Sequence, residues 1–136
     1  MGLPNISAAE MLEIQFRKAS SRGHVHNATL RPSYSHPGVP VDEIPLLEII
    51  DRRGCGIFFT ASGFTIPDRG FVRYEDVERV IWMGHDRNLS RKREEFDRIE
   101  FELADGTRAK LLDLDQAVFP LLKFFGWMIG RRTNAA

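Results

Sequence analysis

The strongest constraint on the fold is the stretch at residues 97–103, DRIEFEL, in which polar and apolar side chains alternate strictly from Arg98 onward. A period of two is typical of a β-strand with one face in the core and the other in water. A second strand is predicted at residues 107–113, directly after the turn residues Ala-Asp-Gly. The two segments are therefore expected to form an antiparallel hairpin.

The length of the loop decides which side chains of this hairpin face the core. A two-residue Asp-Gly turn would set Leu103 opposite Arg108 and place cations on the core face. A three-residue loop, with Gly106 in the left-handed region, sets Leu103 opposite Thr107 and pairs Glu102 with Arg108 on the wet face. Opposite charges across strands each contribute a few tenths of a kcal/mol, so the three-residue loop is predicted. The other pairs in this register are Phe101 with Ala109, Ile99 with Leu111 and Glu100 with Lys110.

Five further strands are predicted upstream, where runs of β-branched and aromatic residues alternate with turn clusters. They cover residues 46–51, 55–60, 64–66, 71–74 and 77–83. The loop at residues 61–63 is expected to hold Gly63 at positive φ. That register sets Thr60 opposite Phe64. Together with the hairpin, these segments give seven antiparallel strands.

The first 45 residues are predicted to form a helix and an extended segment. Ser7 and Glu10 fit a capping box at the start of a helix over residues 8–22, and a glycine follows as its stop. Four prolines and several glycine, serine and asparagine residues exclude a long regular element from residues 23–45. Within that segment, residues 25–30 are predicted to form a short edge strand.

The last predicted element is a helix that is apolar on nearly every side. Asp115 is its expected N-cap, and Pro120 requires either a kink or a helix start near Phe119. One side should cap the sheet, and the other side needs a second cover. The first candidate cover is the N-terminal helix or a second copy of the chain, and the other is a partner groove or a membrane surface.

Length, charge and cysteine content limit the classes of function. The chain has 136 residues, the size of one domain, and its 19 basic residues balance 19 acidic ones. This balance argues against a dedicated nucleic-acid binder. The single cysteine, Cys55, cannot form an internal disulfide and is interpreted as a small buried hydrophobe. Neither a signal-peptide pattern nor a membrane-spanning apolar run is present, so a cytoplasmic location is predicted.

No catalytic residue, metal site or cofactor is predicted. His24 and His26 alternate along the chain, but a zinc site needs three or four convergent ligands and the sequence supplies no others beside them. The histidines are therefore interpreted as solvated loop residues. The enzymatic alternatives are His85 with Asp86, or the two histidines with Asp42 and Glu43.

Two binding surfaces are predicted outside the core. Cations that could contact a partner or an anionic ligand lie in one turn and in a polar loop at residues 84–96, and they are Arg52, Arg53, Arg87, Arg91, Lys92 and Arg93. An apolar surface for a partner is predicted on the last helix at Phe124, Trp127 and Met128.

The order of the predicted strands and helix resembles a known family. The residues that carry the likeness are 56–60 (GIFFT), 63–66 (GFTI) and 72–80 (VRYEDVERV), followed by the hairpin and the last helix. Over residues 46–130 this pattern resembles the bacterial pleckstrin-homology-like (PH-like) domains and the related GRAM-like domains. The resemblance implies an α+β fold, a seven-stranded antiparallel barrel or sandwich capped by a C-terminal helix. That domain would span residues 46–132, with residues 1–45 as an added N-terminal helix and proline-rich extension.

The resemblance also implies a module without catalytic activity. We therefore expect a small cytoplasmic interaction module that binds a protein or peptide partner, as an adaptor or immunity-type protein does, or that self-associates through one of its helices. The alternative is a PH-like domain that binds anionic lipid at a membrane surface. Lipid-binding members use several basic residues around the first hairpin, where this sequence offers Arg52 and Arg53, so any lipid binding is expected to be weak. No nucleic-acid partner is expected.

Overall fold

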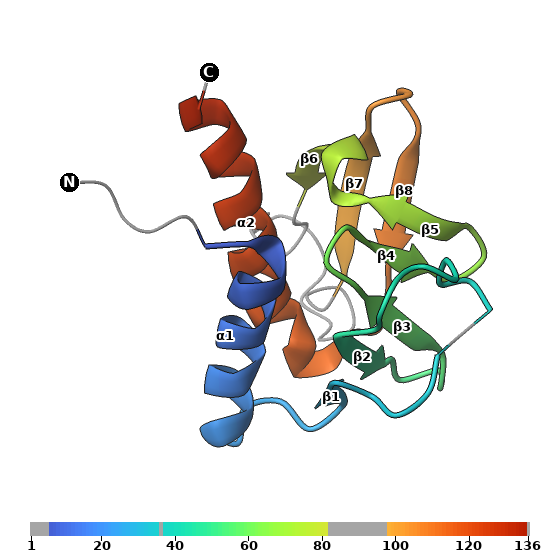
Figure 1. The fold of residues 1–136 in the computed structure, drawn as a ribbon, viewed down its shortest axis with the longest axis vertical. Coiled ribbons are helices and arrows are strands. Elements are labelled where there is room, and N and C mark those ends of the chain that lie inside the picture. The colour runs from blue at the N-terminus through green and yellow to red at the C-terminus, as the bar shows by residue number, and fades with distance from the viewer. Residues whose placement is uncertain (1–5, 36, 82–97, 136) are drawn as a thin grey trace, which may run out of the picture.

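The computed structural model describes residues 6–35, 37–81 and 98–135 (Figure 1). Within these residues the fold is α+β, with one helix near each end and eight antiparallel strands in two sheets between them. The elements in chain order are α1 (Ala8–Ser21), β1 (Ala28–Leu30), β2 (Leu47–Ile50), β3 (Gly56–Phe59), β4 (Gly63–Ile66), β5 (Gly70–Arg73), the 3-10 turn η1 (Tyr74–Asp76), β6 (Val77–Ile81), β7 (Ile99–Leu103), β8 (Arg108–Leu111), the 3-10 turn η4 (Asp115–Ala117) and α2 (Val118–Ala135).

The strands lie in space in the same order as in the chain. Strands β1 to β5 form a five-stranded sheet, and β6 to β8 form a three-stranded sheet. The predicted α+β class and the antiparallel pairing are confirmed, and the seven strands predicted after residue 45 correspond to β2 to β8. The eighth described strand, β1, is the edge strand predicted within residues 25–30, and it pairs with β2 through Ala28 opposite Ile49 and Leu30 opposite Leu47.

The hairpin of β7 and β8 has the predicted register. Phe101 lies opposite Ala109 and Glu102 lies opposite Arg108. The backbone N–H of Leu103 donates to the carbonyl of Thr107 at 2.8 Å, which closes a three-residue loop. The glycine of that loop has a φ of +85°, the left-handed conformation that the prediction requires.

The register predicted for β3 and β4 is wrong by one residue. Phe59 lies opposite Phe64, and the N–H of Thr60 donates to the carbonyl of Gly63 at 2.8 Å, so the loop between the strands has two residues. Gly63 is a strand residue without positive φ. Its lack of a side chain serves a close approach instead, because a Cβ built there would lie 2.3 Å from the carbonyl oxygen of Val72 on β5.

The outer face of the five-stranded sheet is covered by the extended segment between β1 and β2, residues 31–35 and 37–46, which we call the strap. The ring of Tyr34 on the strap meets Phe58 edge to face with a centroid distance of 5.7 Å, and Phe58 is only 1% exposed. Val39 of the strap is also buried. Because the other face of the sheet packs on the core, the consecutive residues Phe58 and Phe59 are both buried.

Two carboxylates fix the strap to the sheet. Glu43 accepts hydrogen bonds from the hydroxyls of Ser62 and Thr60, the latter at 2.7 Å, and these bonds lower the pKa of the Glu43 carboxyl. The hydroxyl of Tyr34 donates to the buried carboxylate of Glu48, which raises the pKa of the tyrosine. The strap therefore lies on the sheet through specific polar contacts as well as apolar ones.

Helix α1 begins with the predicted capping box. The N–H of Glu10 donates to the Ser7 hydroxyl at 3.1 Å, and the Glu10 carboxylate accepts from the N–H of Ser7 at 3.4 Å. The buried face of α1 carries Leu12 and Phe16 into the main core, and the helix lies alongside α2 (Figure 1).

Helix α2 packs on α1 as well as on the core side of the sheets, so the N-terminal helix provides a second cover for this apolar helix (Figure 1). Its residue Phe125 contacts the rings of Phe64 and Phe101, with centroid distances of 5.3 and 5.0 Å. Asp115 is not the N-cap of this helix, since it lies in η4 with a φ of +55°. The helix begins at Val118, so Pro120 falls in the first turn, where a missing N–H costs no hydrogen bond.

Candidate functional site

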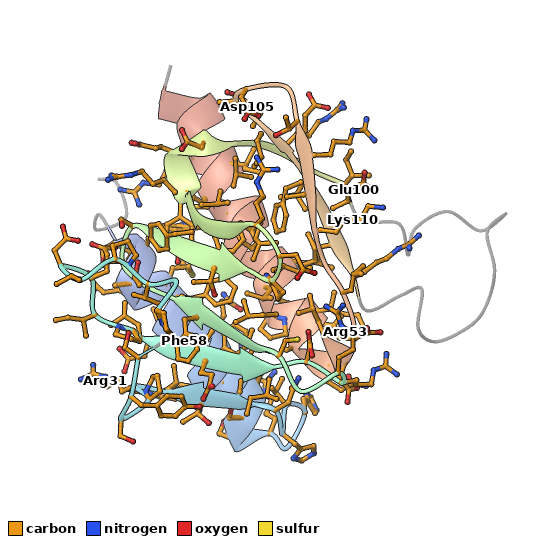
Figure 2. The ribbon with its side chains drawn as sticks, turned by 90° about the vertical axis from the view of Figure 1, so that its right-hand side faces the viewer. Arg31, Arg53, Phe58, Glu100, Asp105 and Lys110 are labelled. Carbon is orange, nitrogen blue, oxygen red and sulfur yellow. The ribbon has the colours of Figure 1, made fainter. Side chains whose placement is uncertain are left out.

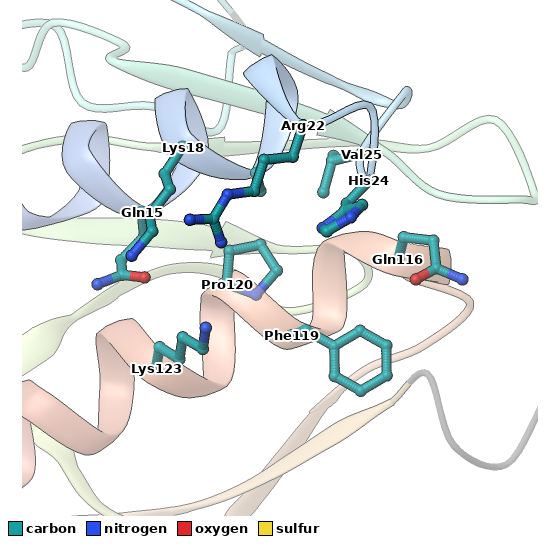
Figure 3. Close-up of a pocket in the computed structure, with 10 residues that line it drawn as sticks. Gln15, Lys18, Arg22, His24, Val25, Gln116, Phe119, Pro120 and Lys123 are labelled. Carbon is teal, nitrogen blue, oxygen red and sulfur yellow. The ribbon is translucent and has the colours of Figure 1, made fainter.

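A cleft of about 290 Å³ opens between the end of α1 and the beginning of α2 (Figure 3). One wall consists of α1 and the residues that follow it, and the other consists of η4 and the first turns of α2. Buried Val25 and Pro120 contribute apolar surface to its lining. The polar residues that line it are Gln15, Lys18, Arg22, His24, Gln116 and Lys123.

The end of α1 places three of these side chains together. Lys18 and Arg22 are four residues apart, so they project from the same face of the helix. Gly23 then adopts a φ of +71°, and the N–H of His24 donates to the carbonyl of Ala19 at 3.0 Å. This turn ends the helix and leaves the imidazole beside the two cations (Figure 3).

The opposite wall follows from the helical spacing of η4 and α2. Gln116, Phe119 and Lys123 recur at intervals of three and four residues, so they share one face. Phe119 is 48% exposed in the lining of the cleft, which is unusual for an aromatic residue on a helix whose other phenylalanines are buried. Figure 3 shows Lys123 and Arg22 extending from opposite walls toward the space above Pro120.

The cleft is electropositive and lacks local neutralisation. Lys18, Arg22 and Lys123 are exposed, and within the described part of the chain none of them forms an ion pair. No described residue that lines the cleft carries a carboxylate. By contrast, Arg17 on the other side of α1 pairs with Glu13. Among the described residues, the three charges of the cleft therefore have no carboxylate partner.

Helix stability accounts for only part of this cluster. Lys18 lies in the last turn of α1, where a cation interacts favourably with the helix dipole. Lys123 lies in the second turn of α2, toward the positive end of that helix, where a cation has no such benefit. Like charges held at one cleft also repel one another. The helix dipole therefore does not account for the position of Lys123.

The chemistry available in the cleft is that of hydrogen-bond donors to an anion. Two ammonium groups and one guanidinium donate only, and the amide groups of Gln15 and Gln116 add neutral donors. The imidazole of His24 adds one N–H when neutral and two when protonated. Such a set suits an oxyanion, which accepts hydrogen bonds at each oxygen.

The turn at Arg52 and Arg53, predicted to bind a partner or an anionic ligand, is held by carboxylates. The guanidinium of Arg53 lies 3.2 Å from Asp51 and 3.3 Å from Asp113. The buried Asp51 also accepts the backbone N–H groups of Arg53 and Cys55, both at 2.9 Å. The backbone N–H of Arg52 donates to the carbonyl of Asp113. Most of the positive charge of this turn is therefore balanced within the chain, and Arg53 serves the turn itself.

The other predicted cations belong to the polar loop after β6. They are Arg87, Arg91, Lys92 and Arg93, and they lie outside the described residues together with His85 and Asp86 of the enzymatic alternative.

The predicted apolar surface on α2 is corrected for two of its three residues. Phe124 is fully buried and Met128 is 8% exposed, because α1 and the sheets cover these sides of the helix. Trp127 is half-buried, and the guanidinium of Arg131 lies over its ring at 5.1 Å from the centroid. An apolar partner surface therefore does not form around Phe124 and Met128 in this fold.

The described residues contain no group of three histidine, cysteine or acidic side chains that could hold a metal ion. Of the second enzymatic alternative, His24 lines the cleft, whereas Glu43 on the strap accepts hydrogen bonds from the hydroxyls of Thr60 and Ser62 between β3 and β4. Among these residues no helix is both long enough and apolar enough to cross a membrane.

Sequence reasoning missed the cleft because its two walls come from opposite ends of the chain. The one available signal was Lys123, the lone cation in an otherwise apolar stretch of α2.

No protein-family model matches the chain, and comparison with curated proteins and with solved structures finds no significant match.

Proposed function

We propose that this protein is a non-enzymatic interaction module of PH-like architecture, and that it binds an acidic segment of a protein partner in the cleft between α1 and α2. The single observation that carries the proposal is the set of cations in the cleft, Lys18, Arg22 and Lys123, which come from two helices and have no carboxylate beside them among the described lining residues.

The arrangement of the strands supports the PH-like part of this proposal. Strands β2 to β5, then β6 to β8, then α2 follow the order of seven strands and one closing helix that the resemblance implies. Helix α1 and β1 are additions to that order, and α1 supplies one wall of the cleft. The proposed binding site thus depends on the part of the chain that lies outside the resemblance.

The proposal is tested by fluorescence anisotropy with a labelled hexaglutamate peptide and the full-length chain. We expect salt-dependent binding that becomes about tenfold weaker when Arg22 and Lys123 are both replaced by glutamine, because two charge-assisted contacts are lost. The matched control is Lys110→Gln, an exposed lysine of β8 on the hairpin (Figure 2). This change should leave the affinity for the peptide unchanged.

The same variants separate a binding role from a structural one. Removing two of three mutually repelling cations should leave the free energy of unfolding unchanged or raise it by a few tenths of a kcal/mol. An absence of peptide binding by the wild-type chain, or equal losses in the cleft variant and the Lys110→Gln control, would refute the proposed function.

A further inference from the structure

The chemistry of the cleft narrows the class of group that enters it. We infer that the cleft takes a phosphate monoester carried on the partner, rather than the carboxylate of an aspartate or glutamate. This inference rests on the proposed function and specifies the acidic group that the partner presents.

The first step is the balance of charge. Lys18, Arg22 and Lys123 bring three positive charges to a space of about 290 Å³, and no described lining residue carries a negative one. One carboxylate would neutralise a single charge and leave two. A phosphate monoester carries about −1.5 to −2 at pH 7 and has three strongly accepting oxygens. Its charge therefore matches the cluster better.

The second step is the direction from which the donors come. Arg22 and Lys18 extend from α1, and Lys123 extends from α2 on the opposite wall (Figure 3). The two oxygens of a carboxylate lie in one plane with its carbon atom, so they are well reached from one side by a guanidinium fork. The oxygens of a phosphate are tetrahedrally arranged and can accept from both walls together.

The third step concerns what carries the phosphate. Phe119 lines the cleft at 48% exposure, beside the buried Pro120, so an apolar group attached to the phosphate would have a surface to contact. Electrostatic recognition of a membrane usually needs a cluster of four to eight basic residues on one surface. This cleft offers three, recessed between two helices, in a chain with no net charge. A phosphorylated side chain of a protein fits these features better than a lipid surface does.

The test uses three small probes that share an aromatic ring, titrated into the full-length chain and followed by NMR chemical shifts. Phenyl phosphate carries the tetrahedral dianion, benzoate carries one carboxylate, and phthalate carries two. We expect phenyl phosphate to bind at least about tenfold more tightly than benzoate or phthalate, with the largest shifts at His24 and at the residues around Lys123. The phenyl phosphate affinity should fall in Arg22→Gln and in Lys123→Gln, and it should be unchanged in Lys110→Gln.

A second set of titrations tests whether a protein or a lipid carries the phosphate. It compares a phosphoserine peptide with the same peptide carrying serine or glutamate at that position, and with vesicles of phosphatidic acid. Binding of phthalate or the glutamate peptide as tightly as their phosphate counterparts would overturn the inference and leave the proposed function in place. Binding to vesicles without binding to the phosphoserine peptide would overturn it in favour of lipid. If neither the phosphoserine peptide nor hexaglutamate binds, the inference and the proposed function are both refuted.

Discussion

Replacement of Gly63 by alanine should destabilise this protein strongly, although it adds a single methyl group. The added Cβ would lie 2.3 Å from the carbonyl oxygen of Val72 and 2.7 Å from the ring of Phe71. Carbon–oxygen contacts of this kind settle at about 3.3–3.6 Å, so one of the two strands must move by about 1 Å. The ring of Phe71 can rotate away, but the oxygen belongs to the backbone of β5 and cannot.

The size of the effect follows from what that movement disturbs. Gly63 lies opposite Arg73 and its neighbour Phe64 lies opposite Val72, so a shift of either strand strains paired backbone. Overpacking of a well-packed site costs about 1–3 kcal/mol, and a weakened backbone hydrogen bond adds about 1 kcal/mol. We therefore expect a loss of about 3 kcal/mol, which for a domain of this size corresponds to a fall in Tm of about 10 °C.

The same change at Gly126 provides the matched control. Gly126 lies exposed in α2, and a Cβ there meets no atom within 4 Å beyond its own helix and chain neighbours. Alanine is favoured over glycine inside a helix by about 1 kcal/mol, so this variant should be as stable as the wild type or more stable. Urea denaturation followed by circular dichroism gives both values. If Gly63→Ala and Gly126→Ala unfold at the same urea concentration, the close approach of β4 and β5 is refuted.

Three further predictions concern polar contacts. The hydroxyl partners of Glu43 hold its pKa below its ordinary value of 4.5, so the bonds stabilise the fold above that pH and are lost as the pH falls through the folded-state pKa. Glu43→Gln should accordingly lower the urea midpoint at pH 7, with the difference from wild type shrinking in titrations below about pH 4.5. Asp51→Asn should cost about 2 kcal/mol by thermal unfolding, because a neutral amide loses the ion pair with Arg53 and accepts the two backbone N–H groups at Oδ1 more weakly than a carboxylate does, whereas Asp42→Asn on the exposed strap should cost almost nothing. Tyr34→Phe should lower the urea midpoint, since Glu48 loses its phenol donor, and an unchanged midpoint would show that water replaces that donor fully.

The hairpin of β7 and β8 could be predicted in full because both of its strands carry the information. Glu102 and Arg108 lie on one face and Phe101 and Ala109 on the other, and a slip of one residue would exchange the two faces. The capping box of α1 is equally local, since Ser7 and its partner are three residues apart. Interactions between residues that are close in the chain are thus the part of this fold that can be predicted most directly from the sequence.

The register of β3 and β4 could not be predicted in the same way. A strand with one wet face shows alternation, but all four residues of β4 are buried and Phe58 and Phe59 are both buried in β3. The alternation is missing because the strap, which lies far from β4 in the sequence, covers the outer face of the five-stranded sheet. Without alternation, no local pattern distinguishes a two-residue loop from a three-residue loop. Gly63 could be the last residue of a three-residue loop or the first strand residue after a two-residue loop.

The candidate site depends on a still longer separation. Helix α1 resembles any amphipathic helix with basic residues in its last turns, and Lys18 there has a sufficient explanation in the helix dipole. The charge of Lys18 indicates a candidate binding cleft only once the structure places Lys123 on the opposite wall. The apolar surface predicted on α2 fails for the same reason, because the cover of Phe124 comes from α1 at the other end of the chain.

This double use of α1 determines how the function can be tested. Its inner face covers α2, while its last turns form one wall of the cleft. The segment after it is also tied to the body of the fold, since β1 pairs with β2 and the side chain of Asn27 donates to the carbonyls of Ile50 and Leu114. A chain shortened by its first 45 residues would expose the core side of α2, so loss of a partner on truncation would report a loss of structure. Substitution of Arg22 or Lys123, whose side chains are exposed and without an ion pair in the described residues, removes the binding charge and leaves these contacts in place.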